Sequence, residues 1–502
     1  MERLDRSLYL LIALFFAIPI SIWLLCWFRW YISLPLVTLL YYVSYRFLAT
    51  NRTLTRSEYK KLFNKQRWII VSIIVITLNV LSGAGGLFYQ NWDYQARNAV
   101  FSDLIQNDWP VTYDYENTAN QFGMHKGILT YYFAWFIPSA LVGKAFGFTV
   151  GSLFLLLQQI VGCLLFFYLL FRYFRQIKVR FVVLFFIFSG IDIVGRMLLS
   201  VINGGSWGPL FGTNHIDTPS FATSPLVFAS FTTQLFWIFN TAVPAWIMTV
   251  LLLNEKDFKF IGLLLLFLIP FTPLPAIGLV LLIIILALFK GDRAKVNTIK
   301  SLFSLQNVLC LLPLLPIAML FLSNSGGQAK GLSIVRVLNE NGITLKGFLS
   351  ILIIYSCEMF ILMIIINRNN RRLLLSYMGA LLLVSLFFVG QGQDLSSKGS
   401  IPLLVAIYIL FCDYILEWGT RVKSSIQNML VVAMLILGGL TPAHEIMRSI
   451  DWSHLNDEHH VSNYATSWKT FSKPKSNEML LFLNNFVSPY QSKSILAKYV
   501  LR

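Results

Sequence analysis

The sequence predicts an all-α membrane protein with about thirteen transmembrane helices, and composition is the first reason for this prediction. The chain has 502 residues, of which 56% are hydrophobic and only 13% charged, and its mean hydropathy is +0.67. A soluble domain is about 25% charged, so this much apolar surface does not suit soluble domains. The apolar segments are continuous runs without alternating polar residues, which favours helices over a β-barrel.

A bilayer core of about 30 Å is crossed by a helix of about 20 apolar residues, and runs of this kind recur along the whole chain. Two of them are short and flank a turn at Pro270, Pro273 and Pro275, so they form either a hairpin or a broken re-entrant pair. The predicted spans are 7–28, 30–48, 68–89, 149–171, 181–199, 236–253, 259–271, 273–289, 305–322, 348–366, 373–390, 401–417 and 427–443.

The apolar stretch Gly127–Gly147 decides the orientation. If it spans the membrane, the basic loops after it lie outside; if it is an interfacial helix on the outer surface, they lie in the cytoplasm, as the positive-inside rule requires. We therefore predict an interfacial helix, a cytoplasmic N-terminus and an extracytoplasmic C-terminus. The net charge of +17 is then an orientation signal and not a nucleic-acid surface. The loop residues concerned are Arg172, Arg175, Lys178, Arg180, Lys290, Arg293, Lys295, Lys300, Arg368, Arg371 and Arg372.

This topology divides the chain into three parts. Residues 1–67 form a transmembrane hairpin with a basic cytoplasmic loop, 68–443 form the transmembrane core, and 444–502 form an extracytoplasmic tail. The cytoplasmic loops are too small for a nucleotide-binding domain and no Walker motif is present, which argues against an ATP-driven pump. The core has outer loops at 90–148, 200–235, 324–347 and 391–400.

The first outer loop has the densest cluster of acidic residues, and Asp93 follows closely after a predicted span. A helix starting here makes Asp93 and Arg97 neighbours, because they are four residues apart. Asp103 lies nearly three turns further, on roughly the same side. Asp93 is either the N-cap of this helix or a functional carboxylate held near the membrane surface.

Two further outer loops present polar residues. The second is rich in Gly, Ser, Thr, Asn and aromatic residues, which suits either a sugar-binding surface or an ordinary interfacial loop, and its polar centre is Asn214, His215 and Asp217. In the fourth, Asp394 and Lys398 are four residues apart, just before a span. They form either a surface pair or a cationic site at a helix start that can neutralise a phosphate.

Ionisable residues also occur within the predicted spans. Asp192 and Arg196 are four residues apart and can pair with each other, whereas Glu358, Asp413 and Glu417 are single acids. Intramembrane charges are costly and are usually paired or functional. These acids keep a proton-coupled transporter open as an alternative.

Several of these segments resemble, in order, those of a family. Residues 85–113, GGLFYQNWDYQARNAVFSDLIQNDWPVTY, are followed by FSGIDIVG, the triplet at His215–Asp217, TTQLFWIFNTAVPAW and DLSSKGSIP. This set is similar to bacterial polytopic enzymes of the glycosyltransferase C (GT-C) superfamily and extends from about residue 84 to residue 402. Lys398 departs from the pattern, which more often has arginine there, and a lysine loses the bidentate fork.

The resemblance implies a GT-C-like fold with interfacial helices in the first outer loop and an acidic catalytic base there. The enzyme would sit in the bacterial plasma (inner) membrane. It would move a sugar from a polyprenyl-phosphate-linked donor to a glycan or lipid-linked acceptor of the cell envelope. Its partners would be these two substrates and the lipid bilayer.

The chemistry of such a transfer supports the roles that the resemblance implies for the predicted site residues. Asp93 takes the proton from the acceptor hydroxyl, and cations offset the charge on the departing phosphate. No definite cofactor or metal site is predicted, although Asp103 and Asp217 offer oxygen ligands of the kind that Mg²⁺ or Mn²⁺ prefers. The donor phosphate would bind Lys398, Arg97, Lys126 and His215. The acceptor or sugar would contact Asp103, Asp217, Asn214, Trp92, Gln234 and Asp394.

Two other functions remain open from the sequence. A flippase or transporter for a lipid-linked glycan would need acids and bases along a path through the bundle, whereas the polar residues here concentrate at the outer face. A polysaccharide polymerase or ligase is also a transferase, but it uses a long glycan as donor.

Overall fold

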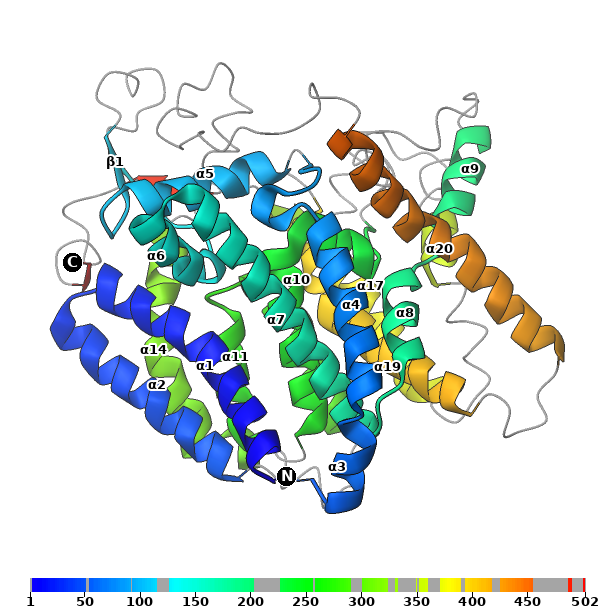
Figure 1. The fold of residues 1–502 in the computed structure, drawn as a ribbon, viewed down its shortest axis with the longest axis horizontal. Coiled ribbons are helices and arrows are strands. Elements are labelled where there is room, and N and C mark those ends of the chain that lie inside the picture. Colours follow the sequence, from blue (N-terminus) through cyan, green and yellow to red (C-terminus); the bar gives the residue numbers. More distant parts are fainter. Residues whose placement is uncertain are drawn as a thin grey trace.

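The computed structural model describes most of the chain as helices that form one bundle (Figure 1). The described residues are 2–50, 54–91, 93–114, 126–202, 226–255, 258–289, 300–323, 330–332, 349, 352–359, 371–389, 393–417, 425–454, 486–489 and 500–501. The main helices are α1 (Glu2–Trp27), α2 (Trp30–Thr50), α3 (Arg56–Leu62), α4 (Lys65–Leu81), α5 (Asp93–Gln106), α6 (Ile137–Phe146), α7 (Phe148–Phe174), α8 (Val179–Ile187), α9 (Asp192–Ile202), α10 (Phe231–Asn254), α11 (Ile261–Leu268), α12 (Pro273–Leu288), α14 (Leu305–Ser323), α17 (Arg371–Ser385), α18 (Asp394–Gly399), α19 (Ile401–Leu416) and α20 (Ser425–His454).

Among the described residues, eight helices are long and apolar enough to cross a membrane. They confirm the membrane character and helical class of the fold. Other predicted spans contain shorter helices: α4 has 17 residues, α12 has 16 and α17 has 15. The total of thirteen spans therefore stays a prediction. The eight long helices are 4–27, 30–50, 148–174, 179–198, 231–254, 305–323, 394–416 and 426–451.

Burial separates a central helix from lipid-facing ones. The apolar window of α10 is entirely buried within the protein, whereas α2 and α20 bury only 28% and 33% of theirs. Large apolar side chains are exposed on the outer helices, including Trp30 on α2 and Ile436 on α20. An apolar exterior is expected where lipid, and not water, is the solvent.

The stretch 127–147 does not form a spanning helix. It folds into strand β2 (Lys126–Leu129), the short helix η3 (Ala134–Phe136) and α6, which has 10 residues and is too short to cross a bilayer. Gly147 has a φ of +89°, and α7 begins directly after it. A Cβ on Gly151 would lie 2.9 Å from the Cα of Gly143, so α6 packs tightly against α7.

Helices α5 and α6 cover one end of the bundle, which we call the α5 end (Figure 1). A small antiparallel sheet of β1 (Thr112–Asp114), β2 and β5 (Val487–Pro489) lies beside them. A second antiparallel pair joins β3 (Lys330–Leu332) to β4 (Phe387–Val389). The α5 end is therefore built from segments distant in sequence.

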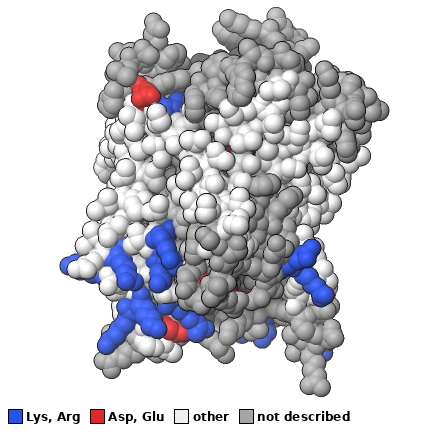
Figure 2. Space-filling view, turned by 90° about the vertical axis from the view of Figure 1, so that its right-hand side faces the viewer, with Lys and Arg blue, Asp and Glu red and all other residues white. Residues whose placement is uncertain are grey.

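The opposite end, the basic end, has α3, the start of α4 and the turn between α7 and α8. Figure 2 shows Lys and Arg side chains gathered at one end of the molecule, below a band that is almost without charge. Contacts hold this end together, because Arg175 binds Glu58 at 2.7 Å and Arg67 donates to the carbonyl of Ile177. The distribution fits the positive-inside rule with this end in the cytoplasm.

Candidate functional site

A tight glycine turn places the start of α5. Helix α4 ends at Leu81, and Gly83 follows with a φ of +85°. A Cβ on Gly83 would lie 2.3 Å from the carbonyl oxygen of Tyr89, so only glycine fits where the chain folds back. The side chain of Gln90 donates to the carbonyl of Gly83 at 2.9 Å and fixes the turn.

Asn91 then anchors the first residue of α5. Its Nδ2 donates to the carbonyl of Phe236 at 2.9 Å, and its Oδ1 accepts from the backbone N–H of Asp93 at 3.2 Å. The side chain that caps this turn is thus Asn91, and the Asp93 carboxylate remains available for other contacts. The N-cap role that the sequence left open for Asp93 is taken by its neighbour.

Asp93 forms an ion pair with Arg97, as the spacing predicts. Oδ2 of Asp93 lies 2.8 Å from Nη2 of Arg97, and the Asp93 side chain is 26% exposed whereas that of Arg97 is 7% exposed. The carboxylate is therefore accessible at the surface, and the guanidinium is beneath it. The pair occupies the first turns of α5.

Arg97 is buried with donors to spare. Its guanidinium lies over the rings of Tyr94 and Phe239, at 5.7 and 5.9 Å from their centroids. Among the described residues, its Nε and Nη1 have no hydrogen-bond partner. Burial is the largest single influence and opposes the charge, but Asp93 and the nearby tyrosines together favour it, so the pKa of Arg97 lies above its ordinary value. A buried cation with two unused donors is chemically able to bind an anionic group.

The second acid–base pair comes from α18. Nζ of Lys398 lies 2.9 Å from Oδ1 of Asp394, and the lysine side chain is 12% exposed. Ser396 anchors this short helix, because its Oγ accepts from the backbone N–H of Val227 at 3.0 Å and lies 3.2 Å from Oγ of Ser385. Asp394 remains 45% exposed, so the lysine is again the more buried partner.

Tyr131 and Tyr132 join the two pairs. Nζ of Lys398 donates to the hydroxyl of Tyr132 at 3.2 Å, and the two tyrosine rings stack with centroids 3.9 Å apart. Burial raises the pKa of Tyr131 well above its ordinary value, against the pull of the positive charges of Lys398 and Arg97. Both cations therefore act on one tyrosine pair, although they are about 300 residues apart in sequence.

Three other predicted site residues are placed by the structure. Asp103 is fully buried and accepts a hydrogen bond from the hydroxyl of Tyr113 at 2.8 Å, which ties α5 to β1. Gln234 is also fully buried and accepts from Nε1 of Trp246 at 2.8 Å. Lys126 is exposed at the start of β2, the central strand of the sheet, opposite Asp114 in the strand register. None of these contacts involves Asp93, Arg97 or Lys398.

The remaining predicted residues, Trp92, Asn214, His215 and Asp217, lie outside the described residues. Within the described part of the chain, no three His, Cys, Asp or Glu residues come together in a group that could hold a metal ion. Asp103, one of the two acids considered for a divalent cation, is bonded to a tyrosine instead.

The intramembrane acids are packed among polar groups. Oδ2 of Asp192 accepts from Oγ of Ser189 at 2.9 Å and from Oγ1 of Thr441 at 3.2 Å. Glu358 lines a cavity with Ser189, Ser230 and several apolar side chains. Asp192 thus links α9 to α20 within the protein.

The sequence did not point to four polar residues of the α5 end. Tyr131 and Tyr132 lie in a stretch that reads as apolar and aromatic, and their role depends on a contact with Lys398. Glu445 and Arg448 lie beyond the predicted last span, but α20 continues to His454 and buries both. Glu445 and Arg448 are three residues apart, which makes them neighbours on a helix, and this spacing could have indicated the pair in the sequence.

Comparison with known proteins gives no match for this chain among protein-family models, curated proteins or solved structures. The chemistry of the site must therefore be inferred from its own residues. It combines one accessible carboxylate with two shielded cations at one end of an apolar bundle. Such a set can accept a proton from a hydroxyl and hold an anion beside it.

Proposed function

We propose that this protein is a membrane glycosyltransferase that uses a polyprenyl-phosphate-linked sugar. It would act on a cell-envelope glycan or lipid-linked acceptor at the extracytoplasmic face, where the α5 end lies if the basic end is cytoplasmic. The observation that supports this most is the convergence of Asp93–Arg97 and Asp394–Lys398 on one tyrosine pair. The resemblance to the GT-C superfamily suggests the same chemistry.

The reaction needs little besides these groups. A phosphate is a good leaving group, so no strong general acid is required when the sugar–phosphate bond breaks. The Asp93 carboxylate takes the proton of the acceptor hydroxyl as its oxygen attacks the sugar carbon. The free donors of Arg97, with Lys398 nearby, offset the charge that develops on the departing phosphate.

The lipid donor fits the location of the site. An apolar exterior lets the bundle sit in the bilayer, where a polyprenyl chain also resides. The donor phosphate would then lie at the membrane surface, which would be the level of α5 because α5 covers one end of the bundle (Figure 1). No soluble nucleotide sugar needs to reach the site.

Asp93→Asn tests this proposal with purified protein in detergent, given polyprenyl-phosphate-linked hexoses or pentoses and envelope glycan acceptors. The wild type should transfer sugar, and Asp93→Asn should be about 10²- to 10⁴-fold slower, the usual contribution of a positioned base. Donor binding should persist, because both cations remain. Near-normal transfer by the variant would remove Asp93 from the mechanism.

The same assay separates a transferase from a flippase. A flippase needs a sealed membrane with two sides, so it produces no transfer in detergent micelles. If the wild type shows no transfer with any donor in detergent yet moves a lipid-linked glycan across vesicles, the transporter alternative replaces this proposal.

A further inference from the structure

The α5 end contains a third ion pair, which lies on α20 and has both of its side chains buried. Glu445 is fully buried and Arg448 is 5% exposed, and Nη2 of Arg448 binds Oε2 of Glu445. The same oxygen accepts a hydrogen bond from Nε1 of Trp237 at 2.8 Å. The Arg448 guanidinium also lies over the ring of Trp237, at 5.0 Å from its centroid.

Trp237 is part of a break in the central helix. Ile238 has a φ of −136° and a ψ of 39°, which are not helical angles, so α10 is kinked between Trp237 and Phe239. A tryptophan beside a kink is not fixed by a regular helix alone. The Glu445–Arg448 pair holds both its N–H and its ring face.

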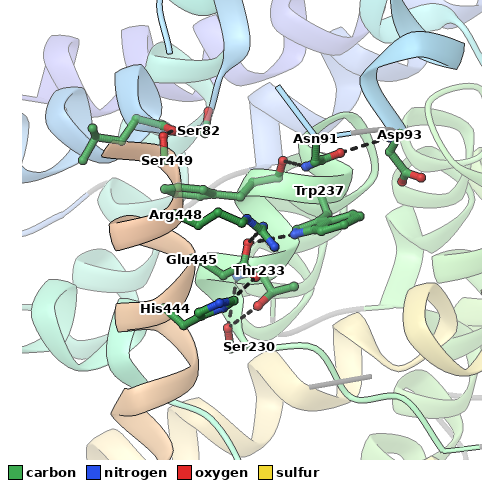
Figure 3. A network of polar contacts seen from close by, with 12 residues as sticks. Ser82, Asn91, Asp93, Ser230, Thr233, Trp237, His444, Glu445, Arg448 and Ser449 are labelled. Atoms are coloured by element: carbon green, nitrogen blue, oxygen red, sulfur yellow. Dashed lines mark hydrogen bonds and ion pairs between the residues drawn. The ribbon is translucent and has the colours of Figure 1, made fainter. Parts of the chain in front are cut away.

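The kinked segment in turn holds both members of the first acid–base pair. The carbonyl of Phe236 accepts from Asn91, which accepts from the backbone of Asp93. The ring of Phe239 stacks on Tyr94 and lies under the Arg97 guanidinium. Figure 3 shows Asn91 and Asp93 close to Trp237, with α20 and its residues on the left.

We infer that the Glu445–Arg448 pair and Trp237 form a positioning network for the candidate site. The pair fixes Trp237, Trp237 fixes the kinked segment of α10, and that segment fixes the backbone of Asp93 and the plane of Arg97. None of the three touches the substrate in this scheme. The inference rests on the proposed function, because it is expressed through the transfer reaction.

The test replaces the pair without leaving an unpaired buried charge, since that alone would destabilise the fold. The variant is Glu445→Gln with Arg448→Gln. Its matched control is Asp5→Asn with Arg172→Gln, which removes the buried pair at the basic end. Both proteins are assayed in detergent for kcat, for KM of a polyprenyl-phosphate-linked sugar and for thermal unfolding.

We expect the α20 variant to lower kcat by about tenfold to a hundredfold with little change in KM, as small misplacements of reacting groups do. The control should be destabilised without loss of kcat in the folded protein. A merely structural role for Glu445 and Arg448 would give the same result in both. Unchanged kcat in a folded α20 variant would overturn the inference.

Trp237→Phe serves if the double variant does not fold, because it keeps an aromatic ring and removes only the N–H donor. It should lower kcat by a smaller factor, and Arg448→Lys, which keeps the charge, should be less impaired than the double variant. Full kcat in Trp237→Phe would contradict the network. Absence of transfer by the wild type would instead overturn the proposed function, and this inference with it.

Discussion

Both ends of the bundle bury an arginine beside an aspartate, but the two arginines differ in what they have left to bind. At the basic end, Arg172 reaches both oxygens of Asp5, through Nε at 3.2 Å and Nη2 at 3.5 Å. The hydroxyl of Tyr168 donates to the same carboxylate, and the ring of Tyr9 lies 4.6 Å from the guanidinium. At the α5 end, Arg97 makes one bond to Asp93, and its Nε and Nη1 have no partner among the described residues.

Under the proposed function, the Asp5–Arg172 pair is structural, whereas the Asp93–Arg97 pair binds substrate. A buried pair is stable when each charge is fully hydrogen-bonded, which the Asp5 cluster approaches. Leaving donors of a buried guanidinium unused costs free energy, so a folded protein retains them where a ligand supplies the missing acceptors. The two clusters also bury their acids differently, because Asp5 is 2% exposed whereas the Asp93 side chain is 26% exposed.

A substitution at Arg97 tests this difference between the two ion pairs most strongly. Arg97→Gln keeps an amide donor but removes the charge, and we expect transfer to fall by about 10²- to 10³-fold, as when a donor that stabilises a developing anion is lost. Binding of polyprenyl phosphate should weaken in parallel, which a radiolabelled lipid would measure. Unaltered binding would mean that the unused donors face no anion.

Replacing Lys398 should lower the transfer rate less than replacing Arg97, because the Lys398 ammonium already has Asp394 and Tyr132 as partners. Lys398→Gln should reduce transfer by about tenfold, which corresponds to one hydrogen bond to a charged group. Lys398→Arg restores the charge and should recover most of the rate. If Lys398→Arg is as slow as Lys398→Gln, packing against Tyr132 matters more than charge.

Tyr168→Phe at the basic end should leave the transfer rate of the folded protein unchanged. It removes a hydroxyl that donates to a buried carboxylate, which should lower the free energy of unfolding by about 1–3 kcal/mol. Thermal unfolding in detergent measures this loss. A slower rate without a stability change would show that the two ends are coupled.

Tyr113→Phe should have the least effect of the four. It removes the hydroxyl that donates to Asp103, and the cost should be about 1 kcal/mol of stability with little change in transfer. This variant also tests the sequence-based role of Asp103. A large loss of transfer rate in a folded variant would support the sequence-based prediction that Asp103 contacts the acceptor.

The sequence predicted what depends on local spacing and on composition. Apolar runs of membrane length indicated the helices, and the distribution of basic residues indicated that 127–147 is not a span. The pairing of Asp93 with Arg97, and of Asp394 with Lys398, followed from a separation of four residues on a helix. The structure contains both pairs.

Features that depend on tertiary contacts were not predictable in this way. The sequence placed Asp103 and Gln234 among the residues that would contact the acceptor or sugar, yet both are fully buried and hydrogen-bonded within the protein, because neighbouring elements close over them. Trp237 is a candidate positioning residue only because α20 extends beside α10 and places Glu445 against it. No pattern in a single sequence brings together residues so distant in the chain.

Strand β5 has a consequence for how the protein is made. Phe486 packs on Tyr131 with ring centroids 4.6 Å apart, and its carbonyl accepts from the N–H of Thr130 at 2.9 Å. During synthesis, Phe486 and β5 are added long after β2, the strand with which β5 pairs. The tyrosines beside Lys398 therefore acquire this support only after α20 and the residues that follow it have been synthesised, so the site is incomplete in a partly synthesised chain.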